Sequence, residues 1–364
     1  MSAESREGLR AYADHLNRKR VALAVMFLVL FAICLASLII GSRIGDSYLS
    51  VSEVFHGIIG DGSSKAVILM GVRFPELLAG VLIGAALGIA GAVMQCVLKN
   101  PLASPYTLGI SNAAAFGASI GILLLNGGII TQSTLVPQIN NPYTVAIMAF
   151  AWSMIGTAII ILIVKITGAT PATMVLAGVA ISSIFSAGVA FLQYTATDGQ
   201  LSALVFWQFG SLSKVSGNMI PLIAAVVIAI SLMFLYLRWD YNATEGGDEV
   251  ARGLGINVNR LRIYTLLGAA VITAICVSFA GVIGFIGLAA PHMVRKVVGD
   301  DHRFLLTGSM IMGAMILVLA DTIAQNAFTS TFGVLPVGII TSFLGGPLFL
   351  YILLRGYKKN AGSL

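Results

Sequence analysis

The sequence is short of charge. Asp, Glu, Lys and Arg make up only 10% of its 364 residues, whereas 58% are hydrophobic and the mean hydropathy is +0.95. Soluble domains usually carry about 25% charged residues. Apolar runs of about 20 residues, each long enough to cross a bilayer of roughly 30 Å, recur along the chain. These features exclude a soluble enzyme and predict an all-α, polytopic transmembrane helical bundle.

The sequence also lacks the motifs on which catalysis depends. It contains no G-x-x-x-x-G-K-[ST] loop to cradle ATP phosphates and no HExxH pair. It has no basic-aromatic patch typical of nucleic-acid binding. Cys34, Cys96 and Cys276 lie in apolar runs without C-x-x-C spacing, which favours buried small side chains over disulfides or metal ligands. We therefore expect no enzyme activity, and no cofactor or metal bound by this chain.

Acidic residues inside the apolar runs are scarce. Ion-driven carriers usually need ionisable groups near the middle of the membrane. Only Asp321 qualifies, and it lies near the outer end of its predicted helix. If this protein is a transporter, we expect its energy to come from another subunit.

Ten membrane segments are predicted, arranged as two halves of five segments with opposite orientation. Two similar stretches, beginning at Arg73 and at Arg260 or Arg262, carry this weak repeat. The eighth segment is too short to cross alone and is expected to be a half-helix supported by protein. The segments are 22–41, 77–98, 109–125, 143–165, 172–193, 219–238, 263–283, 287–298, 304–325 and 336–355.

The distribution of basic residues predicts the orientation. With both termini in the cytoplasm, seventeen of the 21 Lys and Arg residues fall on the cytoplasmic side, as the positive-inside rule requires. We therefore expect residues 1–20 to be a cytoplasmic segment, 21–356 a transmembrane domain and 357–364 a cytoplasmic tail. The multi-pass chain would lie in the cytoplasmic (inner) membrane, in contact with the lipid bilayer.

Glycines recur every four residues in the second segment, at Gly80, Gly84 and Gly88, followed by Ala92. Small residues at this spacing form a flat stripe against which another helix can pack closely. Helix packing is the favoured interpretation, and a pore lining is the alternative.

The stretch from Gly284 to Arg303 contains two histidines, His292 and His302, beside basic and acidic residues. A metal or haem site is one interpretation, and a broken membrane helix is the other. Glycines at 281, 284 and 287 favour the broken helix, and the two histidines are expected at different depths.

Several long motifs resemble the FecCD-type permeases of ABC importers, which carry iron–siderophore complexes, haem or vitamin B12. They run in order from about Arg73 to Leu354 and include "RFPELLAGVLIGAALGIAGAVMQ", "NPLASPYTLGISNAAAFGA", "EVARGLGINVNRLR" and "AGVIGFIGLAAPHMVRKVVGDDHR". The resemblance implies a permease that pairs with a second permease subunit, expected to be an identical copy. It also implies two cytoplasmic ATP-binding subunits and one extracytoplasmic substrate-binding protein.

The resemblance assigns a role to the polar loop 238–262, which from its residues alone is either a solvated connector or a docking helix. "GGDEVARGLG" reads as a short helix stopped by glycine. In the family this segment sits in a cleft of the ATPase. The coupling residues implied here are Glu249, Arg252, Gly253, Leu254 and Gly255.

The outer docking site departs from the family pattern. The family often has arginines at three positions that pair with glutamates of the binding protein; here they are Arg73, Glu76 and Gln325. Because charge pairs at an interface mainly steer and orient the partner, we expect a binding protein with altered charge at this contact. Lys65 and Lys214 could compensate. Alternatively, Glu76 only stabilises the first turn of its helix beside Pro75.

The fifth and tenth segments line the central pathway in the family. Their candidate pathway residues, each with helix packing as the alternative, are Ser182, Ser183, Phe185, Gln193, Thr341, Ser342 and Phe343. A lining with no charged residue suits an importer whose selectivity lies in the binding protein. We expect an iron(III)–siderophore substrate, with haem or cobalamin next, and keep a self-powered secondary transporter as the rival class.

Overall fold

The computed structural model describes residues 3–41, 69–125, 141–168, 170–327 and 334–347, and these segments contain helices but no strands. The α-helices are α1 (Ala3–Gly41), α4 (Phe74–Val97), α5 (Ile110–Leu123), α6 (Pro142–Thr167), α7 (Pro171–Thr195), α8 (Asp198–Gln208), α9 (Ile220–Tyr236), α10 (Arg238–Glu245), α11 (Asp248–Gly253), α12 (Val258–Ala280), α13 (Ile286–Val298) and α14 (His302–Asn326). A π-helical turn, Leu69–Arg73, precedes α4, and two short 3-10 turns, Leu212–Lys214 and Gly217–Met219, precede α9.

Each predicted membrane segment overlaps a helix, although positions 348–355 of the tenth segment lie outside the described residues. Seven helical stretches are long and apolar enough to cross a membrane: Ala13–Ile40, Leu69–Val97, Pro142–Thr167, Pro171–Thr195, Gly217–Tyr236, Val258–Ala280 and His302–Asn326. The other three segments correspond to α5, α13 and the helix Val337–Pro347. With 13 residues, α13 is about 20 Å long, too short to cross the bilayer alone. The all-α, multi-pass fold is confirmed.

Three helical features were not predicted. α1 starts at Ala3, so the charged residues 3–20 and the first membrane segment form one continuous helix. α8 was missed although Thr197 and Gln200 form a capping box at its start, a recognisable sequence signal. α10 was taken as part of a loop because its residues are mostly polar.

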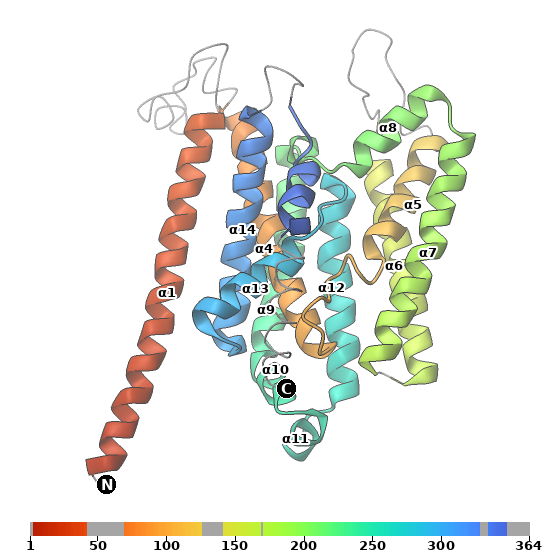
Figure 1. Cartoon of the computed structure of the whole chain (residues 1–364). Helices are drawn as coiled ribbons and strands as arrows, with labels where there is room; N and C mark the ends of the chain where they lie inside the picture. The colour runs from red at the N-terminus through yellow and green to blue at the C-terminus, as the bar shows by residue number, and fades with distance from the viewer. Residues whose placement is uncertain (1–2, 42–68, 126–140, 169, 328–333, 348–364) are drawn as a thin grey trace.

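The centre of the bundle is formed by α4 and α12 (Figure 1). They are the most buried of the seven membrane-length helices and occupy equivalent places in the two predicted halves. By contrast, α1 stands at the edge of the bundle, where it packs along α14 and leaves most of its apolar side chains exposed.

The glycine stripe of α4 packs directly against neighbouring backbones, as predicted. A Cβ atom added at Gly84 would lie 2.4 Å from the carbonyl oxygen of Gly313, and one at Gly88 would lie 2.1 Å from that of Ser309. At Gly91 the added atom would lie 1.7 Å from the carbonyl oxygen of Gly287. Only glycine permits this approach of α4 to α14 and α13, which favours helix packing over a pore lining.

The chain breaks between α12 and α13 in the stretch predicted to contain a broken helix. Gly281 (φ 78°) ends α12, and Phe285, which is not a glycine, also adopts a left-handed conformation (φ 65°) before α13. Pro291 lies inside α13. A bulky residue rarely adopts positive φ, so the surrounding packing must hold Phe285 in place.

The close approach of α4 to α14 predicts a stability difference between two glycine variants. Gly88→Ala would collide with the Ser309 backbone and should destabilise the bundle by about 1–3 kcal/mol. At Gly80 an added Cβ lies 3.2 Å from two side-chain methyl groups, of Leu212 and Val318, which can move. Gly80→Ala should therefore cost clearly less, as measured by thermal unfolding of the purified protein in detergent. Equal melting temperatures for the two variants would contradict this packing.

Candidate functional site

The segment between α9 and α12 protrudes from the end of the bundle at which α1 begins (Figure 1). α11 forms its tip. The five residues assigned to coupling are all exposed there, on α11 or directly after it: Glu249, Arg252, Gly253, Leu254 and Gly255. Leu254 is 68% exposed and Val250 is 52% exposed. The tip therefore presents apolar side chains away from the bundle, where a protein partner can cover them.

The base of the tip is fixed by a charged cluster that sequence reasoning missed. The Asp248 carboxylate pairs with Lys99 (Nζ–Oδ1 2.7 Å) and with Arg262 (Nη2–Oδ2 3.0 Å). The buried Arg262 also donates from Nε to the carbonyl oxygen of Val97 (3.1 Å). The Lys99 hydrogen bond, with the Arg262 charge beside it, holds the pKa of Asp248 below its usual value. Lys99, just after α4, and Arg262, near the start of α12, thus join the tip to both helices.

The short helix predicted at the tip is confirmed. α11 ends at Gly253, and Gly255 then adopts a left-handed conformation (φ 85°). Ala251 packs inward, and Tyr241 of α10 is buried with its hydroxyl 2.9 Å from Thr265 Oγ1. The arrangement is a rigid base with an exposed end, as expected of a docking element.

The three residues assigned to outer docking lie together at the opposite end. Arg73 Nη1 donates to Glu76 Oε2 (3.2 Å) and to Gln325 Oε1, and Gln325 Nε2 donates to Asp321 Oδ2 (2.7 Å). The Arg73 side chain is 25% exposed and that of Glu76 only 6%. Glu76 lies in the first turn of α4 beside Pro75, as the capping alternative predicts. Its carboxylate is therefore turned toward Arg73 and the bundle, and Arg73 is the more accessible charge.

Lys214, suggested as a compensating outer charge, is engaged within the chain. Its Nζ donates to the carbonyl oxygens of Phe206 (2.9 Å) and Trp207 (3.3 Å), near the end of α8. Burial lowers the pKa of Lys214 to about 7. These contacts favour a helix-capping role. Lys65 lies outside the described residues.

A cavity of about 450 Å³ opens beside the helix Val337–Pro347. Of the proposed pathway residues, Ser342 and Phe343 line it. Phe343 is 76% exposed, whereas Thr341 is buried and donates to the Gly338 carbonyl oxygen (3.1 Å). The remaining lining residues are Tyr106, Gln208, Phe209, Val282, Gly284, Phe285, Gly338 and Ile339.

The α7 candidates are divided between the surface and the interior. Ser182 Oγ accepts a hydrogen bond from Asn112 Nδ2 (2.5 Å), and the exposed Ser183 donates to the Val179 carbonyl oxygen (3.0 Å). Gln193 is half-buried near the end of α7. Phe185 is buried in an aromatic cluster with Phe116 and Trp152, which favours packing over a gating role.

The two histidines, expected at different depths, both lie near Cys96 and Glu245. His302 begins α14 and is fully buried beside Asn242 of α10. His292 is half-buried on α13 and lines a second cavity, of about 460 Å³, near Cys96 and Glu245. Cys96 and Cys276 are buried, as expected, and Cys34 is half-buried.

The structure is thus a helical bundle with seven helices of membrane-crossing length among the described residues and an exposed tip joined to the bundle by ion pairs. The sequence matches the FecCD transport family over residues 28–355. The chain therefore belongs to this family of ABC transporter permeases.

Three relatives and one solved structure illustrate the similarity. The chain is 44% identical over 350 residues to the "Putative ABC transporter permease protein MJ0087" of Methanocaldococcus jannaschii, covering 94% of this chain and 97% of that one. It is 35% identical to the hemin transport system permease protein HmuU of Yersinia pestis, covering 81% and 85%. It is 33% identical to the Fe(3+)-citrate import system permease protein YfmE of Bacillus subtilis, covering 94% and 98%.

The solved structure described as "An inward-facing conformation of a putative metal-chelate type ABC transporter" superimposes with a TM-score of 0.78 at 25% identity. The match covers 92% of this chain and 99% of that one.

The ion pairs of Asp248 with Lys99 and Arg262 predict that this carboxylate holds α11 in place. Asp248→Asn leaves the buried Arg262 without its carboxylate and should weaken attachment of α11 by about 1–3 kcal/mol. Backbone amides at 246–256 should then exchange faster with deuterium than in the native protein. Glu249→Gln, one residue further on but solvent-exposed, serves as the control. Native exchange rates in Asp248→Asn would show that these ion pairs do not hold the tip.

Proposed function

We propose that this chain is the membrane-spanning permease subunit of an ATP-binding-cassette importer that carries a metal chelate. ATP would bind to two separate cytoplasmic subunits, and an extracytoplasmic binding protein would deliver the substrate. The observation that carries the proposal is the tip, because an exposed short helix that presents Val250 and Leu254 on an anchored base can transmit movement from a partner into α4 and α12.

We place the tip and the start of α1 on the cytoplasmic side of the cytoplasmic membrane. Both lie at one end of the bundle, and the positive-inside rule assigns the predicted loops of that end to the cytoplasm. The cluster around Arg73 then faces outward, where the binding protein would dock.

A second copy of this chain would complete the translocation pathway. The exposed apolar side chains of α7, including Leu176 and Phe191, and the exposed Phe343 give two surfaces for a partner or lipid. The cavity beside Val337–Pro347 would open toward the pathway between the copies. ATP-driven closure of the two ATPases would tilt the permeases and alternate access to it.

The proposed substrate is an iron(III)–siderophore complex, with haem or cobalamin as the alternative. Relatives named for haemin and for iron(III)-citrate support the metal-chelate class. The cavity lining is mainly apolar and aromatic, with few polar groups such as Tyr106, Gln208 and Ser342. Such a lining has little capacity to select among chelates, so the binding protein would carry the selectivity.

The positions of the buried carboxylates argue against the rival class, a self-powered carrier. Within the described part of α4 and α14, the acidic side chains Glu76 and Asp321 lie at the outer end and are held by Arg73 and Gln325. Coupling ions usually bind near the membrane midplane.

Disrupting the tip should prevent the permease from stimulating ATP hydrolysis by its partner. Leu254→Asp places a charge on the apolar contact and should lower permease-stimulated ATPase activity about tenfold or more in reconstituted vesicles. Asn218→Asp, an exposed position on the turn before α9, adds the same charge elsewhere and should leave that activity unchanged. Uptake by this chain in vesicles without ATP or the ATPase would instead establish the rival class.

Reversing the charge at Glu76 should weaken docking of the native binding protein. Glu76→Arg removes an acceptor of Arg73 and places a like charge beside it, so the dissociation constant should rise roughly tenfold, or about 1.4 kcal/mol. Surface plasmon resonance on the permease in nanodiscs measures this constant. Asn218→Arg controls for added positive charge, and tighter binding by Glu76→Arg would contradict the proposed charge pattern.

A further inference from the structure

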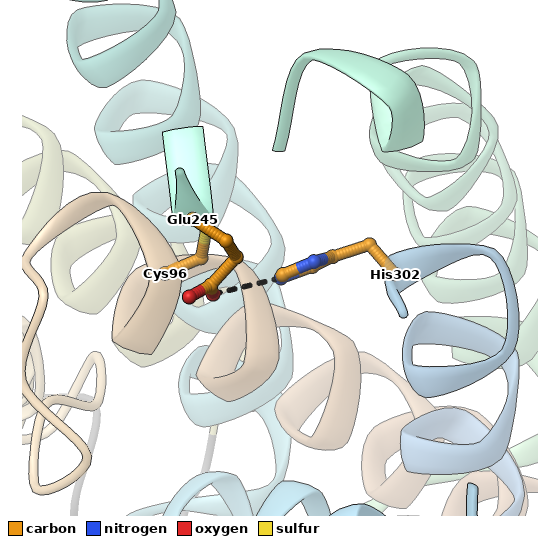
Figure 2. Close-up of side chains that lie close together, drawn as sticks. All are labelled: Cys96, Glu245 and His302. Carbon is orange, nitrogen blue, oxygen red and sulfur yellow. Dashed lines mark ion pairs between the residues drawn. The ribbon is translucent and has the colours of Figure 1, made fainter. Parts of the chain in front are cut away.

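Three potential metal ligands from distant parts of the sequence meet at the cytoplasmic end of the bundle (Figure 2). They are Cys96 near the end of α4, Glu245 at the end of α10 and His302 at the start of α14. One ligand atom from each lies within 4.8 Å of the others. His302 Nε2 lies 3.9 Å from Glu245 Oε1, and the two side chains point toward each other.

The imidazole of His302 is oriented as metal-binding histidines usually are. Asn242 Oδ1 accepts the His302 backbone N–H (2.8 Å) and lies 3.1 Å from Nδ1, while Asn242 Nδ2 donates to Asp301 Oδ1 (3.0 Å). An oxygen at that position requires Nδ1 to be the protonated nitrogen. The lone pair is therefore on Nε2, and a hydrogen bond from the second ring nitrogen to a fixed oxygen is typical of a metal ligand.

The Nε2 atom has no hydrogen-bond partner among the described residues, although the His302 side chain is 0% exposed. A buried acceptor without a donor is costly. A metal ion between Nε2, the Cys96 sulfur and the Glu245 carboxylate would remove that cost. This role goes beyond the expectation that Cys96 is only a buried small side chain.

Nearby cations are already paired with other carboxylates. Lys99 pairs with Asp248 (2.7 Å), and Arg295 pairs with Asp300 (3.1 Å) and donates to Gln95 Oε1 (2.5 Å). Both cations also act on Glu245 through their charge, but neither forms an ion pair with it among the described residues. The cavity of about 460 Å³ beside Cys96 and Glu245 leaves space for a fourth ligand such as water.

We propose that Cys96, Glu245 and His302 form a binding site for a borderline divalent transition-metal ion, with Zn²⁺ as the first choice. One thiolate, one imidazole and one carboxylate suit Zn²⁺ or Co²⁺, whereas Mg²⁺ and Ca²⁺ prefer sets of oxygen ligands. Zn–N and Zn–S bonds of roughly 2.0–2.3 Å require the ligands to close by about 1 Å. Glu245 is 47% exposed on its side-chain surface, so its carboxylate can move toward the ion, whereas Cys96 and His302 are buried and need a small shift of α4 or α14.

Cobalt titration tests the site on the full-length chain, without its partners, in detergent after removal of metal by a chelator. Co²⁺ should bind with one equivalent per chain and give a thiolate-to-cobalt charge-transfer band, which Zn²⁺ should abolish. Cys96→Ser should remove the band. Glu245→Gln should lower the affinity at least about tenfold, the usual penalty for even an outer-shell partner. Cys276→Ser, a buried thiol of α12 outside the cluster, should retain native binding.

Because Glu245 is exposed, its replacement by Gln should leave the fold intact. Weaker cobalt binding by this variant therefore reports the loss of a ligand and not misfolding. No charge-transfer band at one equivalent in the native chain would overturn the proposal. A band that persists in Cys96→Ser, or unchanged affinity in Glu245→Gln, would also overturn it. The readout needs only this chain, so it is independent of the proposed transport function.

Discussion

In the described helices α4 and α14, charged side chains lie at the ends, because the hydrocarbon core of a membrane offers an unpaired ion no compensation. At the end opposite the tip, Arg73, Glu76, Asp321 and Gln325 form one connected group. At the other end, Lys99, Asp248 and Arg262 form another. Each group joins helices from both halves of the chain, so the ends are fixed while the middle remains apolar.

Helix α4 connects these two charged groups. Arg73 precedes it, and the Val97 carbonyl oxygen at its end accepts from Arg262. Between them, Gly84, Gly88 and Gly91 bring its backbone against α14 and α13 more closely than any other residue would allow. In the proposed importer, this helix is the direct structural connection between the docking end and the coupling end.

Much of the fold was predictable because its signals are local. Apolar run length located the seven helices that are long enough to cross a membrane, and glycines marked both the α4 stripe and the break before α13. The exposed tip was also predictable, since its glycines stop α11. Contacts between distant positions were not predictable from one sequence. No local pattern indicates that Asp248 pairs with Lys99 or that Cys96 lies near His302. The sequence also does not show that the Glu76 carboxylate is buried, because a charged residue at the start of a helix can lie either in the interior or on the surface.

The central claim is that α11 is the contact through which an ATPase drives this permease. The most direct test places a photo-crosslinking amino acid at position 254 in cells and identifies the captured protein by mass spectrometry. The account predicts a cytoplasmic subunit containing a nucleotide-binding loop, captured from position 254 but not from position 218 at the other end. Capture of no such ATPase from position 254, or equal capture from both positions, would contradict it.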